Sequence, residues 1–499
     1  MTSHTAPAGA RIDATPAASN HVSRPRRRAS VSAGLALVLG LSVAPETRAD
    51  VFDPQRELIS RGVQAVLLCN GLFTSQRERA AVEVQELAYL RGEPAPAQVN
   101  EALGLVTIGD PWDGPVARAA FRPGIGCVVM HPDQSDLDVE ALPALPPAPD
   151  PASNDDVPWP LGDDVPDAPL PAEIDAAALR AASDWAFDRP GVENPDEQDT
   201  LSLLVVHRGR IVHERYADGV DVETRTRTWS TAKSLLAAMV GMLVDEGRLE
   251  LDAPLPVDWL PERAPQDDDD PRRAITLRDV LQMSSGLDPV DSWGREYGTG
   301  SGLSYWAGES SSEGARNRGL IRTPGSTWDY ENYDTLLAVA AMKQVLGEDA
   351  YHAFPRERLF GPLGMHTTLA STDRFGDFIL SSQVYANARD LARFGLFWLQ
   401  RGVWNGERLL SEEWIDFTTT PAPSTAERGN FYGGQFWLPP DDRTDVPRDA
   451  YSTAGNRGQF VIVSPQHDLV VVRRGLDHGR QGFDRWDLLR EVLRALPPT

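Results

Sequence analysis

Ser230 and Lys233 lie three positions apart and could act together as a nucleophile and its base. The chain has 48 Lys and Arg residues, and only Lys233 and Lys343 among them are lysines. An amine can give up its proton near neutral pH whereas a guanidinium cannot, so a rare lysine indicates a position that needs proton transfer. Residues three apart share a helix face, which brings hydroxyl and amine together as an activated nucleophile. A capping serine beside a solvated lysine is the alternative.

A second candidate group is the segment 329–332, which contains Tyr330 and Asn332 and precedes an apolar helical run. A phenol can act as a base where cations stabilise the phenolate, and a carboxamide can bind a substrate carbonyl. Tyr330 is therefore a candidate catalytic residue and Asn332 a candidate substrate-binding residue. A tyrosine that simply packs before a helix is the alternative.

The third candidate group is the segment 452–459, in which Thr453 and Gly455 precede the apolar residues 460–463. Small residues on an edge strand allow a ligand to lie along the backbone. A backbone N–H of the strand can then donate a hydrogen bond to an oxyanion of the ligand. Thr453 and Gly455 are therefore candidate substrate-binding residues. An ordinary tight turn before a strand is the alternative.

These groups need secondary structure to position them, and the spacing of apolar residues predicts it. Apolar residues recur at helical spacing from Leu235 to Val244, so we expect Ser230 at the N-terminus of a helix that ends near Glu246. A sheet that joins both ends of the main domain would give an α/β sandwich. The other expected elements are helices over 172–187, 336–346 and 484–496, a hairpin over 201–216, and strands at 460–463 and 469–472.

Residues 1–49 have the order of a secretory signal: a basic cluster, an apolar run at 29–44, and small residues before a cleavage site near Ala49. The apolar run is shorter than the roughly 20 residues of a membrane span, so we expect no span in the mature chain. We therefore expect a periplasmic or secreted protein. Its net charge of −25 argues against nucleic acid as a partner.

The composition divides the rest of the chain into three parts. Residues 50–131 predict a small α+β extension, with a helical stretch near 76–91 and apolar runs beside Cys69 and Cys127. The two cysteines could form a disulfide in an oxidising compartment, and two buried thiols are the alternative. The Pro- and Asp-rich segment 132–171 predicts a linker that lies over the surface or is left mobile, and the main domain follows over 172–499.

Other patterns are less informative. The acidic run 267–270 lacks the spaced ligands of a calcium loop and predicts a solvated loop. The segment 292–318 either covers the site or forms a surface insertion, and it contains Trp293, Tyr297, Tyr305 and Trp306. We find no nucleophile elbow, phosphate loop, dinucleotide fingerprint or zinc motif, so we expect neither a metal nor a cofactor.

The three candidate groups, in this order along the chain, resemble the motifs of the β-lactamase and penicillin-recognising serine hydrolases. They are the Ser230–Lys233 pair, the Tyr330–Asn332 pair and the glycine-containing segment near Gly455. The separation of 100 residues between Ser230 and Tyr330 is similar to that of the class C-like branch. The phrases at 281–287, 359–365 and 388–395 also resemble this branch, in particular esterases and 6-aminohexanoate-dimer hydrolases. The resemblance covers about residues 190–497.

This resemblance implies a β-lactamase-like sandwich of an antiparallel sheet with flanking helices, together with an all-helical region. It implies that Ser230 is acylated, that Lys233 is its base or proton relay, and that Tyr330 is a partner base and acid. It further implies that Asn332 orients the substrate. The backbone N–H groups of Ser230 and of the strand near Gly455 would form the oxyanion hole.

Two positions depart from the pattern of the family. Thr453 stands where many relatives have a Lys or His that contacts a substrate carboxylate, which makes penicillin turnover less expected, although Arg457 could substitute. Glu331 replaces the usual small residue and could alter the charge of the site.

We therefore expect an exported serine hydrolase that cleaves a small ester or amide through an acyl-enzyme on Ser230. A penicillin-binding or D-alanyl peptidase-like protein and a non-catalytic binding protein with this fold are the alternatives. The oligomeric state stays open.

Overall fold

A computed structural model describes residues 53–147, 154–261, 269–291, 300–479 and 481–497. The expected export signal at residues 1–49, with its cleavage site near Ala49, lies outside the described residues, as do Trp293 and Tyr297. Within the described ranges, no helix combines the length and the apolar character that crossing a membrane requires.

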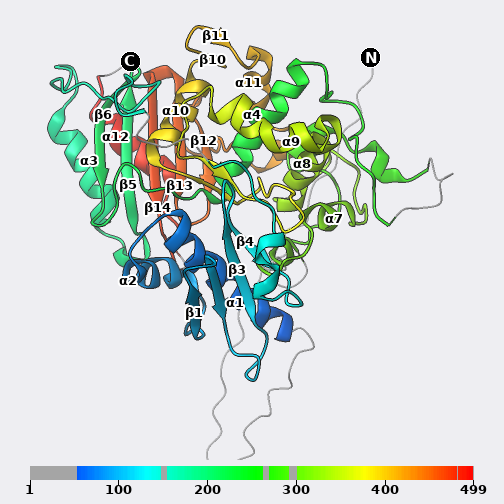
Figure 1. Cartoon of the computed structure of the whole chain (residues 1–499). Helices are drawn as coiled ribbons and strands as arrows, with labels where there is room; N and C mark the ends of the chain where they lie inside the picture. Colours follow the sequence, from blue (N-terminus) through cyan, green and yellow to red (C-terminus); the bar gives the residue numbers. More distant parts are fainter. Residues whose placement is uncertain (1–52, 148–153, 262–268, 292–299, 480, 498–499) are drawn as a thin grey trace, which may run out of the picture. The chain divides into compact units, whose positions relative to one another are not determined.

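The centre of the main domain is a five-stranded antiparallel sheet with the order β12-β13-β14-β5-β6. The first hairpin and the closing strands are therefore neighbours, as expected (Figure 1). Arg208 and Gly209 form the hairpin turn with φ of 50° and 74°, the left-handed region that two-residue hairpin turns favour. The strands are β5 (Thr200–His207), β6 (Arg210–Tyr216), β12 (Tyr451–Gly455), β13 (Gln459–Ser464) and β14 (Leu469–Gly475).

Helices cover both faces of this sheet. Apolar side chains of α3 and α12 share a buried cluster with Val205 and Val471 on one face. On the other face, α10 approaches so closely that a Cβ on Gly395 would lie 2.5 Å from Cγ1 of Val470. This arrangement confirms the expected α/β sandwich. The three helices are α3 (Ala176–Asp188), α10 (Ala388–Leu399) and α12 (Arg485–Leu493).

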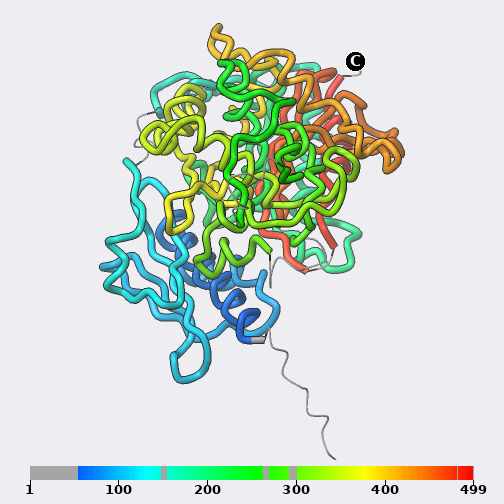
Figure 2. The backbone as a smooth tube through the Cα atoms, turned by 90° about the vertical axis from the view of Figure 1, so that its right-hand side faces the viewer, coloured from blue at the N-terminus to red at the C-terminus, as the bar shows by residue number. Residues whose placement is uncertain are grey.

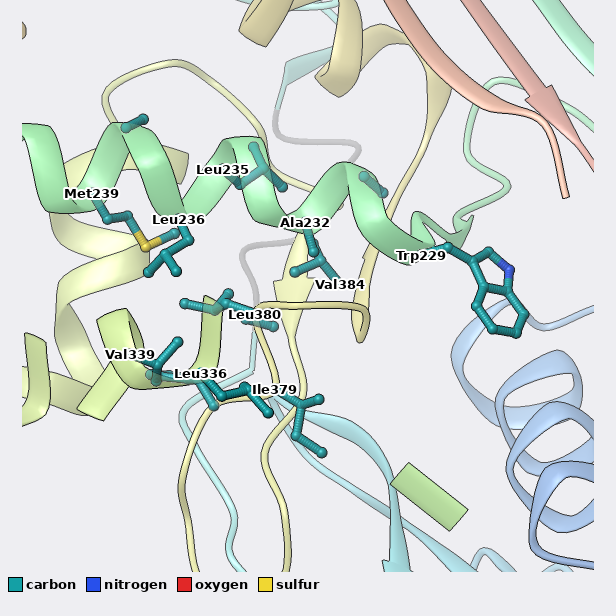
Figure 3. Packing of buried hydrophobic residues seen from close by; sticks show 14 of the residues in the cluster. Trp229, Ala232, Leu235, Leu236, Met239, Leu336, Val339, Ile379, Leu380 and Val384 are labelled. Atoms are coloured by element: carbon teal, nitrogen blue, oxygen red, sulfur yellow. The ribbon is translucent and has the colours of Figure 1, made fainter. Parts of the chain in front are cut away.

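A largely helical region completes the domain, and α4 (Ala232–Asp245) runs through its core. Figure 3 shows Leu236 and Met239 of α4 facing Leu336 and Val339 of α8. The helix expected at 336–346 begins earlier, at Asn332. The remaining elements are α5 (Leu277–Leu281), α6 (Gly302–Trp306), α7 (Ser311–Arg316), α8 (Asn332–Leu346), α9 (Glu348–Phe354), α11 (Glu412–Thr419), β7 (Thr226–Arg227), β8 (Leu369–Ala370), β9 (Val384–Ala386), β10 (Val403–Trp404) and β11 (Glu407–Arg408).

Between residues 53 and 130 the chain forms α1, several short turns and a four-stranded antiparallel sheet, blue to cyan in Figure 1 and Figure 2. A disulfide between Cys69 and Cys127 joins α1 to β4. Apolar residues of α1 and of this sheet belong to the same buried cluster as those of α4 and α8, so the extension and the main domain share one core. The elements are α1 (Asp53–Cys69), β1 (Ala97–Asn100), β2 (Leu105–Ile108), β3 (Ala117–Arg122) and β4 (Gly126–Met130).

The helical stretch expected near 76–91 is a series of short turns rather than one helix. It consists of α2 (Arg79–Ala81), a π-helix (Val82–Glu86) and a 3₁₀ turn (Leu87–Tyr89). Residues 82–89 are the clamp segment of the extension.

Part of the described Pro- and Asp-rich segment is bound to the main domain. Ser135 caps a 3₁₀ turn at Asp136–Ala141, and residues 160–163 accept hydrogen bonds from Arg393 of α10.

We expected a solvated loop at 267–270, of which residues 267 and 268 lie outside the described residues. Asp269 is exposed, but the prediction is wrong for Asp270, which is buried. Its carboxylate pairs with Arg272 at 2.8 Å and accepts the backbone N–H of Arg272 at the start of a short 3₁₀ turn. An acidic residue with a nearby arginine and an N-cap position can be buried at little cost, which composition alone does not reveal.

Candidate active site

Ser230 lies in a 3₁₀ turn (Trp229–Thr231) that leads directly into α4. Its neighbours Trp229 and Thr231 are buried, whereas Ser230 is half-buried. Trp229 has a φ of 49°, a left-handed conformation that is strained for a bulky residue and that concentrates at functional sites. The turn therefore holds the Ser230 hydroxyl at the accessible end of a buried helix.

Lys233 is one helical turn further on and is almost completely buried, with 1% of its surface exposed. Its Nζ lies 3.4 Å from Ser230 Oγ, 2.6 Å from Asn332 Oδ1 and 2.7 Å from the Ser381 carbonyl oxygen. Nζ can donate to all three oxygens as an ammonium, and a neutral amine that donates to the amide and carbonyl oxygens would direct its lone pair at the Ser230 hydroxyl. The separation from Ser230 is long for a hydrogen bond, as is common in catalytic pairs before substrate binds.

Asn332 begins α8, and its side chain is fixed from two sides. Nδ2 donates to Ser301 Oγ at 2.9 Å, which leaves Oδ1 for Lys233. The Asn332 backbone N–H donates to Asp291 Oδ2 at 2.8 Å, and Asp291 Oδ1 accepts the Ser301 N–H at 2.7 Å. The carboxamide thus orients Lys233, and its expected contact with a substrate stays a prediction.

Tyr330 lies two residues before α8, and Lys233 Nζ is 5.1 Å from the centre of its ring. The ring also packs among aromatic side chains, with centroid distances of 5.6 Å to Trp437, 6.1 Å to Trp328 and 6.3 Å to Tyr432. Such contacts restrict the ring and hold the phenol beside the amine. Residues from the first two predicted groups therefore meet around Lys233.

The third predicted segment meets the Ser230 turn through the backbone. A Cβ on Gly455 would lie 2.1 Å from the Thr228 carbonyl oxygen, so glycine is required for β12 to come this close. The hydroxyls of Thr231 and Thr453 are hydrogen-bonded at 3.0 Å, and Thr453 Oγ1 also accepts the Val461 N–H. The Thr453 side chain is buried and already engaged inside the protein, so its expected contact with a substrate stays a prediction.

The suggestion that Arg457 could replace the missing substrate-binding cation is wrong. The Arg457 guanidinium is buried and pairs with Glu86 of the extension at 2.8 Å. A guanidinium that is desolvated and bonded to a carboxylate is not available to a substrate.

Some residues that support the site had no signal in the sequence. Ser381 contributes its backbone carbonyl, which every residue has, and its Oγ is hydrogen-bonded to Tyr305 OH. Tyr305 and Trp306 of the segment 292–318 are buried, so this part of the segment supports the site from inside. The roles expected for the segment as a whole, a cover over the site or a surface insertion, stay predictions.

Glu331, between Tyr330 and Asn332, is buried, and its Oε2 accepts the Asp291 N–H at 2.9 Å. The pKa of Glu331 is raised to about 8, mainly by desolvation and secondly by the negative charge of Asp291. At neutral pH this side chain is therefore mostly uncharged. Although two acids are neighbours here, no group of three or more His, Cys, Asp or Glu side chains in the described part of the chain is arranged to hold a metal ion.

Comparison with known proteins gives the family. The model of the Beta-lactamase family matches residues 192–485. A 6-aminohexanoate-dimer hydrolase from Paenarthrobacter ureafaciens is 26% identical over 329 residues, which are 62% of this chain and 79% of that protein.

Solved structures share the fold. A Bacillus anthracis protein, provisionally described as a 6-aminohexanoate-dimer hydrolase, has a TM-score of 0.53 at 20% identity and covers 67% of this chain and 90% of its own. A penicillin-binding protein homologue from Caulobacter crescentus has a TM-score of 0.50 at 16% identity and covers 65% of this chain and 97% of its own.

The residues that the family model matches include Ser230, Lys233, Tyr330, Asn332 and Gly455. They also include the five-stranded sheet and α4, which hold these residues together. The chain therefore belongs to the β-lactamase family and is a serine hydrolase of the penicillin-recognising superfamily.

Proposed function

We propose that this chain is an exported serine hydrolase that cleaves a small ester or amide through an acyl-enzyme intermediate on Ser230. The observation that carries the proposal is the position of Lys233 Nζ between Ser230 Oγ, Asn332 Oδ1 and the Ser381 carbonyl oxygen. Two of these atoms can only accept hydrogen bonds, so they hold the N–H groups of a neutral amine and leave its lone pair for the serine proton.

The reaction proceeds in two halves. Lys233 takes the proton of Ser230 Oγ as this oxygen bonds to the carbonyl carbon of the substrate, and the carbonyl π electrons move to its oxygen. The N–H groups of Ser230 and of the backbone near Gly455 stabilise that oxyanion. The carbonyl forms again as the bond from its carbon to the leaving oxygen or nitrogen breaks, and the leaving group receives the proton from Lys233 with Tyr330 as the relay, while the acyl group stays on Ser230. Water then gives a proton to Lys233 and Tyr330 as it attacks the ester carbon. The bond between that carbon and Ser230 Oγ breaks, Oγ takes up this proton, and the acid is released.

The surroundings favour a neutral ester or amide over a penicillin. Thr453 supplies no charge to the third segment, and the cation of Arg457 is buried against Glu86. A substrate carboxylate therefore has no partner in these two side chains, and its desolvation would be uncompensated there.

The test is intact-mass analysis of the protein after separate exposure to a fluorophosphonate, a p-nitrophenyl ester and penicillin. We expect a fluorophosphonate adduct and ester turnover in the wild type, and neither in Ser230→Ala. Lys233→Arg should lower the acylation rate by about 10²–10⁴-fold, because an arginine keeps the charge but cannot accept the proton.

Lys343→Arg is the matched control. Lys343 binds Asp377 and Glu348 by ion pairs, which an arginine can also form, so this variant should keep the wild-type rates. A stable penicillin adduct without ester turnover would replace the proposal with a penicillin-binding protein. A folded protein that forms no adduct at all would replace it with a binding protein.

The export part of the proposal rests on the basic, apolar and small-residue order of residues 24–49. Expression of the full chain with its own N-terminus should give a secreted or periplasmic product whose mass lacks residues 1–49. A product that keeps them and stays in the cytoplasm would refute export without affecting the catalytic proposal.

A further inference from the structure

The clamp segment of the extension binds the turn that joins β12 to β13. Arg457 of this turn is buried, and its guanidinium donates to Glu86 Oε2 at 2.8 Å, to the Glu86 carbonyl at 3.3 Å and to the Gln85 carbonyl at 2.7 Å. It also donates to the carbonyls of Leu476 and Asp477 at the end of the sheet. Arg457 thus ties the extension to the sheet edge.

Glu86 is the acidic partner on which this contact depends. It is buried, and its other carboxylate oxygen lies 3.5 Å from Arg77 Nη1 of the extension. Two buried guanidinium groups therefore share one carboxylate. Removing a buried charge partner is far more costly than losing an exposed one, because the remaining charges stay desolvated.

Tyr89 makes two contacts at the end of the clamp segment. Its hydroxyl accepts a hydrogen bond from Asn456 Nδ2 at 2.9 Å. Its ring lies 5.3 Å from the ring of Trp229, which also packs against Trp306 at 6.1 Å. Figure 3 shows the Trp229 side chain extending away from α4 toward the blue ribbon of the extension.

These contacts reach both backbone segments that would form the oxyanion hole. Trp229 directly precedes Ser230, and Asn456 directly follows Gly455. Trp229 and Arg457 both have positive φ, 49° and 60°, which large side chains rarely adopt unless their surroundings hold them. In both cases those surroundings include the clamp segment.

We infer that Glu86 and Tyr89 are positioning residues for catalysis, so the extension is a part of the active site that lies outside the family domain. The inference rests on the proposed function of Ser230. Oxyanion donors act only when they are held in place before the reaction, and small displacements are costly. Loss of either contact should therefore slow acylation more than it weakens substrate binding.

The experiment measures kcat and KM for a p-nitrophenyl ester and the rate of fluorophosphonate labelling at Ser230. Tyr89→Phe removes the hydroxyl that accepts the Asn456 hydrogen bond and keeps the ring that contacts Trp229. We expect kcat and the labelling rate to fall by between about 10- and 100-fold, with KM within about twofold of the wild type and an unchanged thermal midpoint. Glu86→Gln should likewise lower kcat and the labelling rate without changing KM, and it should also lower the thermal midpoint.

The matched controls are Tyr216→Phe and Glu83→Gln. The Tyr216 hydroxyl binds Glu214 on β6, and Glu83 forms an exposed pair with Arg79 in the extension itself. Both variants should keep the wild-type kinetics. A double-mutant cycle of Tyr89→Phe with Asn456→Ala should show that the two losses in kcat are not additive, because they remove the same bond.

Failure of the two proposals can be told apart. A wild type that is not labelled at Ser230 refutes the proposed function and this inference with it. A wild type that is labelled, together with Tyr89→Phe at wild-type kcat and labelling rate, overturns the inference alone. Should Glu86→Gln fail to fold, Tyr89→Phe and the cycle with Asn456 decide the question.

Discussion

The chemistry of a side chain in this fold depends on the atoms around it, as the two lysines show. Lys233 is surrounded by neutral oxygen acceptors, whereas Lys343 lies between the carboxylates of Asp377 and Glu348. Desolvation acts to lower the pKa of Lys343, but its hydrogen bonds to Asp377 and Glu348 outweigh it and raise that pKa. A lysine held as a cation is suited to structure, and one among neutral acceptors is suited to proton transfer.

At the same scale, Glu331 makes the stability of the protein depend on pH. Its pKa is raised from 4.5 to about 8, first by desolvation and then by the charge of Asp291. Between these values the folded chain keeps a proton that the unfolded chain has lost, so stability falls as the pH rises from about 4.5 to about 8. Each unit of pKa difference corresponds to about 1.4 kcal/mol.

Glu331→Gln should therefore flatten the pH dependence of the free energy of unfolding across this range and stabilise the protein at pH 8.5. Glutamine keeps an oxygen to accept the Asp291 N–H. Urea unfolding at pH 5, 7 and 8.5 measures the effect, and Glu313→Gln, a change of an exposed carboxylate on α7, is the control. Parallel pH profiles for the wild type and Glu331→Gln would contradict the expected raised pKa.

At the residue scale, the sequence was most informative about Ser230 and Lys233, because lysine is so rare in this chain. It could not identify the Ser381 carbonyl, which carries no side-chain signature, or Glu86 and Tyr89, which lie far from the site in sequence. It also left open what Arg457 binds, because an arginine's partner depends on tertiary structure.

At the scale of elements, apolar spacing predicted those segments whose burial is regular. The helix that follows Ser230 and the strands on both sides of Arg208 are regular, and each lies where the spacing predicts it. The turns at 79–89 are irregular, and Glu86 among them binds Arg457 of the main domain. Periodicity cannot anticipate such contacts.

α10 provides a prediction at this scale. Arg393 is completely buried and donates to Asp390 at 3.0 Å, to Asp163 at 2.7 Å and to the carbonyls of Pro160 and Gly162. It fixes the linker onto the helix that covers the sheet. Arg393→Met should lower the free energy of unfolding by about 3–5 kcal/mol, because it leaves the buried carboxylate of Asp390 without its arginine, although Asp163 keeps its pair with Arg389.

Urea unfolding of Arg393→Met and of Arg401→Met tests this. Arg401 forms exposed ion pairs with Glu412 and Asp416, so its loss should cost less than about 1 kcal/mol. Equal losses in the two variants would mean that Arg393 holds the linker no more firmly than a surface pair does.

At the scale of the whole molecule, composition and contact divide the chain differently. The Pro- and Asp-rich segment indicates a boundary between the extension and the main domain, yet one buried cluster contains Val66 of α1, Leu235 of α4 and Leu337 of α8. A change in composition marks a connecting segment, but it carries no information about whether the parts on either side pack together. The extension was therefore expected from the sequence as a module, and its place in the active site was not.

The disulfide connects this architecture to stability and to catalysis. Cys69 ends α1 and Cys127 lies in β4, and 58 positions separate them in the sequence. Closing a loop of this length lowers the conformational entropy of the unfolded chain, which stabilises the folded protein by about 4 kcal/mol. Reduction should therefore lower the urea midpoint of the wild type, and ester hydrolysis should be lost at the same lower urea concentration, because Glu86 and Tyr89 belong to the part that the disulfide stabilises.

The variant Cys69→Ala/Cys127→Ala isolates the bond from other effects of a reductant. Without any reductant, its urea midpoint should equal that of the reduced wild type, and adding a reductant should not change this midpoint. Unfolding followed by tryptophan fluorescence and hydrolysis of a p-nitrophenyl ester should then give coincident transitions, because the extension shares its core with the catalytic domain. If hydrolysis instead survives at urea concentrations where the extension has unfolded, the catalytic residues are held by the family domain alone, and the clamp segment has no part in positioning them.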